Sequence, residues 1–401
     1  MRQRDRPIAV LAVLLLVVAG TGAVVALGSA RGPAAPGPGA SWHGGLPAGL
    51  VPPSAAAAPS AGSTPAAETA GAPAGGAAVA PPHTGPVAAA VPLPPSSGDL
   101  LIADRGNDRL LIVTPGGSIA WSMTIDPGGP LGGQSWGPDD AFFTPDGRHI
   151  VVNEENGQMI ALVDIATRRI VWSYGHPGVA GSAPGYLDGP DDAYQLPDGT
   201  ITVADIRNER ILFIVPGSGV VRQYGLTASR VHDPPRTYAA PNGDVPLPDG
   251  GMLVTEIGGR WVDRLDASGH LVWSVHLADI AYPSDAQLLA GGNVLVVDYS
   301  TPGRVEEVTP RGAVVWRYAI RSGAGMLSNP SLGVRLPNGN IAVTDDFRHR
   351  VVVIDPRSHR IVWQYGHTDV AGSSAGFLDN PDGLDPVPPA TLALLATAPG
   401  P

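Results

Sequence analysis

The chain has 401 residues, of which 53 are glycine, 43 are proline and none is cysteine, and its formal net charge at pH 7 is −11. The absence of cysteine excludes disulfides, thiol chemistry and a lipid-modified cysteine anchor. The negative charge argues against non-specific binding to nucleic acid or to anionic membrane surfaces.

The N-terminal 30 residues have the pattern of a segment that enters a membrane. Residues 1–6 contain three arginines and form a short cytoplasmic region, and residues 7–30 are an uncharged apolar stretch. Such a stretch is long enough to cross a bilayer as a helix, and preceding positive charge favours export of the remainder. We therefore predict a single transmembrane helix in the cell membrane with an extracytoplasmic domain. A cleaved signal peptide, with a secreted product, is the alternative.

Residues 31–97 consist mainly of Ala, Pro and Gly with few charges. A segment of this composition cannot bury enough apolar surface to fold. We expect a disordered, semi-extended linker between the membrane and the folded domain.

A unit of about forty residues recurs six times between residues 98 and 366, for example at 137–175, 189–225 and 329–366. Each unit contains four short runs of alternating apolar residues, separated by turns such as Pro-Asp-Gly, and none shows sustained helical periodicity. A four-stranded repeat of this length is the signature of a β-propeller blade. The predicted fold is all-β: a six-bladed β-propeller with four-stranded antiparallel blades over residues 98–390.

The two ends of the repeat region are both incomplete. Residues 376–390 resemble the start of a blade, whereas the first copy begins clearly only at its second strand. We predict that the C-terminal strand joins the N-terminal blade and closes the ring, which removes an exposed sheet edge. Residues 391–401 are then a tail. A strand at 88–94 or at 391–397 would instead give a local first blade or a seventh blade.

The strand directions place the connectors between blades on one face of the ring, here called the top face, together with the starts of the first strands. Alignment brings Asp140, Asp192 and Asp285 to one register there, with Asp244 one position away. Converging carboxylates repel one another unless a cation or a proton intervenes. We predict that these four residues bind a ligand; the cofactor stays open, with a divalent cation such as calcium as the candidate. The alternative is that each aspartate bonds to nearby backbone N–H groups.

Three histidines are candidate catalytic residues. His176 and His367 follow Tyr-Gly in two related connectors, and with Asp140 and Asp192 they are also candidate metal ligands. His232 lies in a connector unlike the others. The alternative for all three is an ordinary loop histidine in contact with solvent.

Two repeated patterns are predicted to be architectural. An Asp and an Arg five residues apart recur where the second strand turns into the third, and we expect a charge-assisted bond across each hairpin. A tryptophan recurs in the fourth strand and should pack between blades. The pairs are Asp104 with Arg109, Asp205 with Arg210 and Asp345 with Arg350, and the tryptophans are Trp121, Trp172, Trp273, Trp316 and Trp363.

The segments IADRGNDRLLIVTPGG, VADIRNERILFIV and VTDDFRHRVVVIDP resemble NHL repeats, while LPNGNIAV and GGNVLVVD are similar to repeats of quinoprotein-like propellers and arylsulfotransferases. NHL proteins mostly bind protein or nucleic acid, and some relatives are metal-dependent lyases or hydrolases. The arylsulfotransferase resemblance implies a histidine nucleophile, for which His232 is the candidate. Pyrroloquinoline quinone enzymes often require a vicinal disulfide, which this chain cannot form.

No established catalytic motif occurs in the sequence. We therefore predict a membrane-anchored extracytoplasmic β-propeller that binds an extracellular protein or a small-molecule ligand, and no nucleic acid. The alternative is a propeller enzyme, either a metal-dependent lyase or hydrolase or an arylsulfotransferase-like protein, with its site at the top-face mouth of the channel.

Overall fold

The computed structural model describes residues 98–125 and 137–397. The predicted membrane helix at 7–30, the linker and the alternative strand at 88–94 lie outside these described residues. Within them, no helix combines the length and apolar character needed to span a bilayer.

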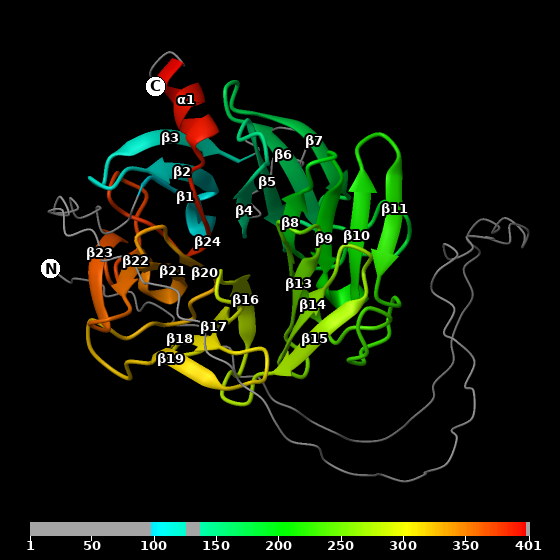
Figure 1. Cartoon of the computed structure of the whole chain (residues 1–401). Helices are drawn as coiled ribbons and strands as arrows, with labels where there is room; N and C mark the ends of the chain where they lie inside the picture. Colours follow the sequence, from blue (N-terminus) through cyan, green and yellow to red (C-terminus); the bar gives the residue numbers. More distant parts are fainter. Residues whose placement is uncertain (1–97, 126–136, 398–401) are drawn as a thin grey trace, which may run out of the picture. The chain divides into compact units, whose positions relative to one another are not determined.

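Six four-stranded antiparallel sheets are arranged around a common centre, which confirms the predicted six-bladed propeller (Figure 1). Blade 1 contains β24 (Pro381–Pro386), β1 (Leu100–Asp104), β2 (Arg109–Val113) and β3 (Ile119–Thr124). Blade 2 contains β4 (Ala141–Phe143), β5 (His149–Glu154), β6 (Met159–Asp164) and β7 (Arg169–Gly175). Blade 3 contains β8 (Pro190–Gln195), β9 (Ile201–Asp205), β10 (Arg210–Val215) and β11 (Gly219–Tyr224).

The remaining blades repeat this order. Blade 4 contains β12 (Pro241–Pro246), β13 (Met252–Glu256), β14 (Trp261–Leu265) and β15 (Leu271–His276). Blade 5 contains β16 (Pro283–Leu288), β17 (Val294–Asp298), β18 (Arg304–Val308) and β19 (Val314–Tyr318). Blade 6 contains β20 (Gly333–Arg335), β21 (Ile341–Asp345), β22 (Arg350–Asp355) and β23 (Arg360–Gly366). Short 3-10 turns follow three of the second strands: η1 (Arg105–Asn107), η2 (Ile206–Asn208) and η3 (Asp346–Arg348).

The ring closes through its C-terminal strand, as predicted. β24 pairs antiparallel with β1, with Leu101 opposite Asp385 and Ile102 opposite Leu384. Blade 1 therefore takes its innermost strand from one end of the repeat region and its other three strands from the other end. This closure gives β1 a hydrogen-bonded partner on its inner side and completes a four-stranded blade.

The segment at 391–397, considered above as an additional strand, is helical. It belongs to α1 (Pro389–Thr397), whose Ala- and Leu-rich sequence with a proline at its start favours a helix. Thr391 Oγ1 donates a hydrogen bond to the carbonyl of Gly147, at 2.6 Å. A Cβ atom at Gly147 would lie only 2.9 Å from that hydroxyl, so glycine allows the helix to dock on blade 2.

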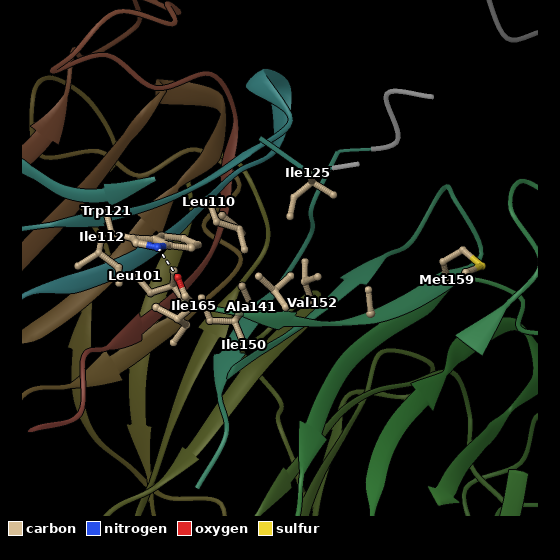
Figure 2. Close-up of a cluster of buried hydrophobic side chains, with 13 residues drawn as sticks. Leu101, Leu110, Ile112, Trp121, Ile125, Ala141, Ile150, Val152, Met159 and Ile165 are labelled. Carbon is tan, nitrogen blue, oxygen red and sulfur yellow. Dashed lines mark hydrogen bonds between the residues drawn. The ribbon is translucent and has the colours of Figure 1, made fainter. Parts of the chain in front are cut away.

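Apolar side chains fill the spaces between neighbouring blades. Figure 2 shows the cluster between blades 1 and 2, where the buried Trp121 donates from Nε1 to the carbonyl of Ile165 at 3.0 Å. The equivalent Trp316 donates to Pro356 at 2.9 Å, and Trp363 donates to Pro115 at 2.9 Å. Each bond links a blade to the next one, so the predicted inter-blade role of these tryptophans is confirmed.

The Asp–Arg pairs are also architectural. Asp104 and Arg109 are joined at 2.6 Å, and the pairs Asp205–Arg210 and Asp345–Arg350 at 2.7 Å. In each pair the same guanidinium also donates to carbonyl groups of the preceding connector. The pairs therefore fasten the connectors to the hairpins at the top face.

Candidate functional site

A pocket of about 380 Å³ opens at the top-face mouth of the central channel; we call it the mouth pocket. Its walls come from the starts of first strands and from the turns that follow second strands, because the propeller brings these segments of successive blades to one end of the channel. Its acidic lining residues are Asp139, Asp140, Glu155, Asp191, Asp192, Asp285 and Asp382. Arg105 is the single lysine or arginine among the residues that line it.

The structure brings together three of the four aspartates expected to bind a ligand. Asp140, Asp192 and Asp285 all line the mouth pocket and are buried. Oδ2 of Asp192 has no hydrogen-bond partner among the described residues. Asp244 is fully buried in β12 and is not among the lining residues.

Arg105 neutralises one side of the pocket. Its guanidinium contacts Asp139, lies 2.6 Å from Asp382 and 3.2 Å from Glu155. Neither Arg105 nor Glu155 was predicted from the sequence as a site residue. Arg105 directly follows β1 and Glu155 directly follows β5, and each of these strands is the second strand of its blade. This shared position is the signal that could have revealed them.

The pocket aspartates that Arg105 does not contact have pKa values raised above the usual aspartate range. Burial, together with the charge of Asp382, raises the pKa of Asp140 to about 7. Burial also raises the pKa of Asp285 to about 7. For Asp191 and Asp192, burial and neighbouring carboxylates raise the pKa well above the usual aspartate range. These groups therefore need protons or a cation to balance their charge.

The arrangement suits a cation with oxygen ligands. Single carboxylate oxygens of Asp139, Asp140 and Asp191 all lie within 4.8 Å of one another. Three aromatic rings line the pocket beside them, with Tyr282 and Tyr299 at a centroid distance of 5.5 Å and Tyr299 and Phe347 at 6.2 Å. The pocket thus combines an acidic wall with an aromatic surface.

His176 and His367 lie elsewhere. Both are exposed, and they occupy equivalent positions in their connectors, where His176 packs on Tyr186 at 3.9 Å and His367 packs on Phe377 at 4.1 Å. Neither lines the mouth pocket. The structure therefore does not place these histidines beside Asp140 and Asp192, as a joint metal site would require.

His232 belongs to a separate group in blade 4. Its Nδ1 lies 2.7 Å from Oε1 of Glu256, and its Nε2 lies 3.1 Å from Oγ of Ser274. The imidazole is stacked on Trp261 at 4.0 Å, with an interplanar angle of 8°, and Oδ2 of Asp263 lies 3.9 Å from Nδ1. We call these five residues the blade 4 cluster. It shares no residue with the mouth pocket.

Of this cluster, only His232 was predicted from the sequence as a site residue. Glu256 and Trp261 face each other across β13 and β14, at the positions where blades 1, 3, 5 and 6 have an Asp–Arg pair and blade 2 has Glu154 opposite Met159. This departure from the repeat is the signal that could have revealed the cluster. The buried positions of Asp263 and Glu256 follow from strand register, which the sequence alone did not settle.

Burial sets the protonation of the blade 4 cluster. Burial and the neighbouring Asp263 raise the pKa of Glu256 to about 10. Burial also raises the pKa of Asp263 and lowers the pKa of His232. At neutral pH these shifts favour a protonated Glu256 and a neutral His232.

Comparisons with known proteins identify the fold. No protein-family model matches the chain, and no curated protein matches it in sequence. Among solved structures, a protein of unknown function from Bacteroides caccae has 18% identity and a TM-score of 0.51, covering 72% of this chain and 98% of its own. A structure of a nidogen/laminin complex gives 14% identity and a TM-score of 0.49, with 71% of this chain and 97% of that one covered.

A virginiamycin B lyase from Staphylococcus aureus gives 16% identity and a TM-score of 0.40, with 58% of this chain and 70% of that one covered. Identities this low carry no information about shared ligands or reactions. The similarity to the Bacteroides caccae protein supports the architecture, and the chain is a six-bladed β-propeller.

Proposed function

We propose that this chain is an extracytoplasmic binding module whose mouth pocket holds a divalent cation such as calcium and, beside it, an extracellular protein or small-molecule ligand. The observation that carries the proposal is the imbalance of charge in the pocket, where seven carboxylates face one guanidinium. The resemblance of the repeats to NHL propellers, which mostly bind other molecules, agrees with a binding role. The net charge of −11 argues against nucleic acid as the partner.

The proposal of a cation rests on how charge is distributed in the mouth pocket. Arg105 already contacts Asp139, Asp382 and Glu155. The remaining four aspartates, which are Asp140, Asp191, Asp192 and Asp285, have no comparable basic partner among the lining residues. Calcium takes six to eight oxygen ligands in flexible geometry, so a ring of aspartates from different blades suits it.

The proposal of a ligand beside the cation rests on the aromatic surface of the mouth pocket. Tyr282, Tyr299 and Phe347 line the same pocket, and the side chain of Phe347 is largely exposed. Exposed aromatic rings beside convergent polar groups are typical of ligand sites. We infer that the cation orients polar groups of the ligand while these rings contact its apolar part.

The location is inferred from the N-terminal sequence. Residues 7–30 are uncharged and apolar after three arginines, which favours a membrane anchor and an external propeller. The absence of His176, His232 and His367 from the residues that line the mouth pocket favours binding over a histidine-dependent reaction there.

Calcium binding by the purified full chain tests the proposal. The chelator-treated protein is titrated with calcium by calorimetry, and thermal unfolding is followed in parallel. We expect binding and an increase in stability, about 2.7 kcal/mol when calcium is present at 100 times its Kd. Asp192→Asn and Asp140→Asn should each weaken binding at least tenfold, because each removes a buried charge from the pocket.

Asp198→Asn is the matched control. Asp198 is an exposed aspartate in a hairpin turn of blade 3, the blade that contains Asp192, and it accepts a hydrogen bond from the N–H of Thr200 at 2.9 Å. This variant should bind calcium as the unmodified chain does. The proposal is wrong if the unmodified chain binds no divalent cation, or if both pocket variants keep full affinity.

A further inference from the structure

Blades 4 and 5 each bury an acidic residue at the same position of the third strand. Glu306 in β18 faces Arg317 in β19, and Asp263 in β14 faces Ser274 in β15. In blade 5 the acid has an internal cation, since Nε of Arg317 lies 2.7 Å from Oε1 of Glu306. In blade 4 the corresponding cation is missing.

A second basic residue is missing from the same place. Blades 1, 3, 5 and 6 have an arginine opposite the aspartate that ends the second strand. Blade 4 has Trp261 opposite Glu256. Glu256 and Asp263 are both fully buried, and among the described residues the only basic side chain that forms an ion-pair contact with either is His232.

The three side chains converge on one point. Single ligand atoms of His232, Glu256 and Asp263 all lie within 4.8 Å of one another. Glu256 and Ser274 lie close enough to Asp263 to lower its pKa. Even so, neither carboxylate oxygen of Asp263 forms a hydrogen bond with another described residue. A fully buried carboxylate without such bonds is costly, and it indicates that a partner belongs there.

The surroundings hold the imidazole in a suitable orientation. Ser274 Oγ can accept a hydrogen bond from Nε2–H, which leaves the lone pair of Nδ1 directed to the two carboxylates. Trp261 stacks flat against the ring and limits its rotation. A hydrogen bond at the second nitrogen of a ligating histidine is the usual way to orient it. The side chain of His232 is 22% exposed, so an ion can reach the group from solvent.

We propose that the blade 4 cluster is a binding site for a divalent transition-metal ion of the zinc type, with His232 Nδ1, Glu256 and Asp263 as its protein ligands. One imidazole nitrogen with two carboxylates suits borderline cations such as zinc, whereas the mouth pocket offers oxygen ligands that suit calcium. The metal ion provides in blade 4 the positive charge that Arg317 provides in blade 5. The site is independent of the mouth pocket, because the two share no residue.

Zinc binding by the full chain tests this site. The chelator-treated protein is titrated with zinc in competition with a chromophoric chelator, and the coordination shell is examined by X-ray absorption. We expect one ion with a nitrogen and oxygen shell. His232→Ala should weaken zinc binding at least tenfold. Ser274→Arg, which places the arginine of blade 5 at the same register of blade 4, should do the same while circular dichroism stays unchanged.

Three further variants keep the test decisive. If Ser274→Arg fails to fold, Asp263→Asn removes one ligand with almost no change of volume and should also weaken zinc binding at least tenfold. His176→Ala removes an exposed histidine and should leave zinc affinity unchanged. Asp192→Asn, in the mouth pocket, should weaken calcium binding and leave zinc binding intact, which separates the two sites.

Two results would overturn the site. One is an unmodified chain that binds no zinc at micromolar concentration. The other is equal zinc affinity in the unmodified chain, His232→Ala and Asp263→Asn, because the ion would then bind elsewhere.

Discussion

Blades 4 and 5 are neighbours with the same four-strand layout, and each buries a carboxylate at the same register, yet they balance that charge differently (Figure 1). Blade 5 places Arg317 directly across from Glu306. Blade 4 places Ser274 across from Asp263 and adds His232 from the connector. In these two blades, the buried acid that faces an arginine is part of the architecture, and the buried acid that faces a serine belongs to the blade 4 cluster.

The mouth pocket follows the same logic at the centre of the ring. Arg105 balances the carboxylates on one side, and the aspartates on the other side have raised pKa values because burial and mutual repulsion disfavour their charged forms. Charge that the fold leaves unbalanced marks both candidate sites.

Breaking the pair in blade 5 should have the largest effect on stability. Arg317→Met keeps most of the side-chain volume but leaves the buried Glu306 without its closest guanidinium. We expect the free energy of unfolding to fall by about 2 kcal/mol, less than for an ion pair buried on both sides, because the Arg317 side chain is 38% exposed and Arg304 remains 4.0 Å from Glu306. Urea denaturation measures the change.

Arg264→Met in blade 4 is the control for that substitution. Arg264 contacts Asp249, whose side chain is mostly exposed, so the loss should be at most about 1 kcal/mol. Equal losses in the two variants would contradict the distinction between the blades.

The second-largest expected difference lies in how stability depends on pH in the unmodified chain and in Glu256→Gln. The pKa of Glu256 is raised from its ordinary value of 4.5 to about 10, so the folded state binds more protons than the unfolded state between these values. The resulting stabilisation is complete below pH 4.5 and is lost as the pH rises through about 10. One such proton contributes a slope of at most about 1.4 kcal/mol per pH unit.

Glu256→Gln should remove this slope. The amide does not ionise, and at pH 7 it can donate to His232 Nδ1 and accept from the N–H of Ala239, as the protonated acid does. Metal-free thermal unfolding between pH 6 and pH 9 should show the unmodified chain losing more stability per pH unit than the variant. Parallel curves would mean that Glu256 is already ionised in the folded protein.

The smallest effect is expected just outside the blade 4 cluster. Arg236 contacts Asp233 in the connector that carries His232, but its side chain is 80% exposed. Arg236→Ala should change the free energy of unfolding by less than about 0.5 kcal/mol, because water screens exposed pairs. Its zinc affinity should match that of the unmodified chain. A large effect on either quantity would show that the connector, and not the buried cluster, controls the behaviour of blade 4.

The sequence alone determined the architecture of this protein. Strand periodicity, the Pro-Asp-Gly turns and the repeated Trp and Asp–Arg positions are local signals that recur in several blades, and the shared register of Asp140, Asp192 and Asp285 follows from them. The helix α1 was harder to predict, because a short apolar segment such as 391–397 suits either a strand or a helix until its contacts with Gly147 are known.

Only the tertiary structure decided which charges meet. Arg105 and Asp382 are separated by 277 residues yet lie 2.6 Å apart, and Ser274, which the sequence pattern did not single out, contacts His232 from another element. Periodicity predicts which side chains share the face of one strand. It does not specify which loops and blades the closed ring brings together, and the balance of buried charge depends on those long-range contacts.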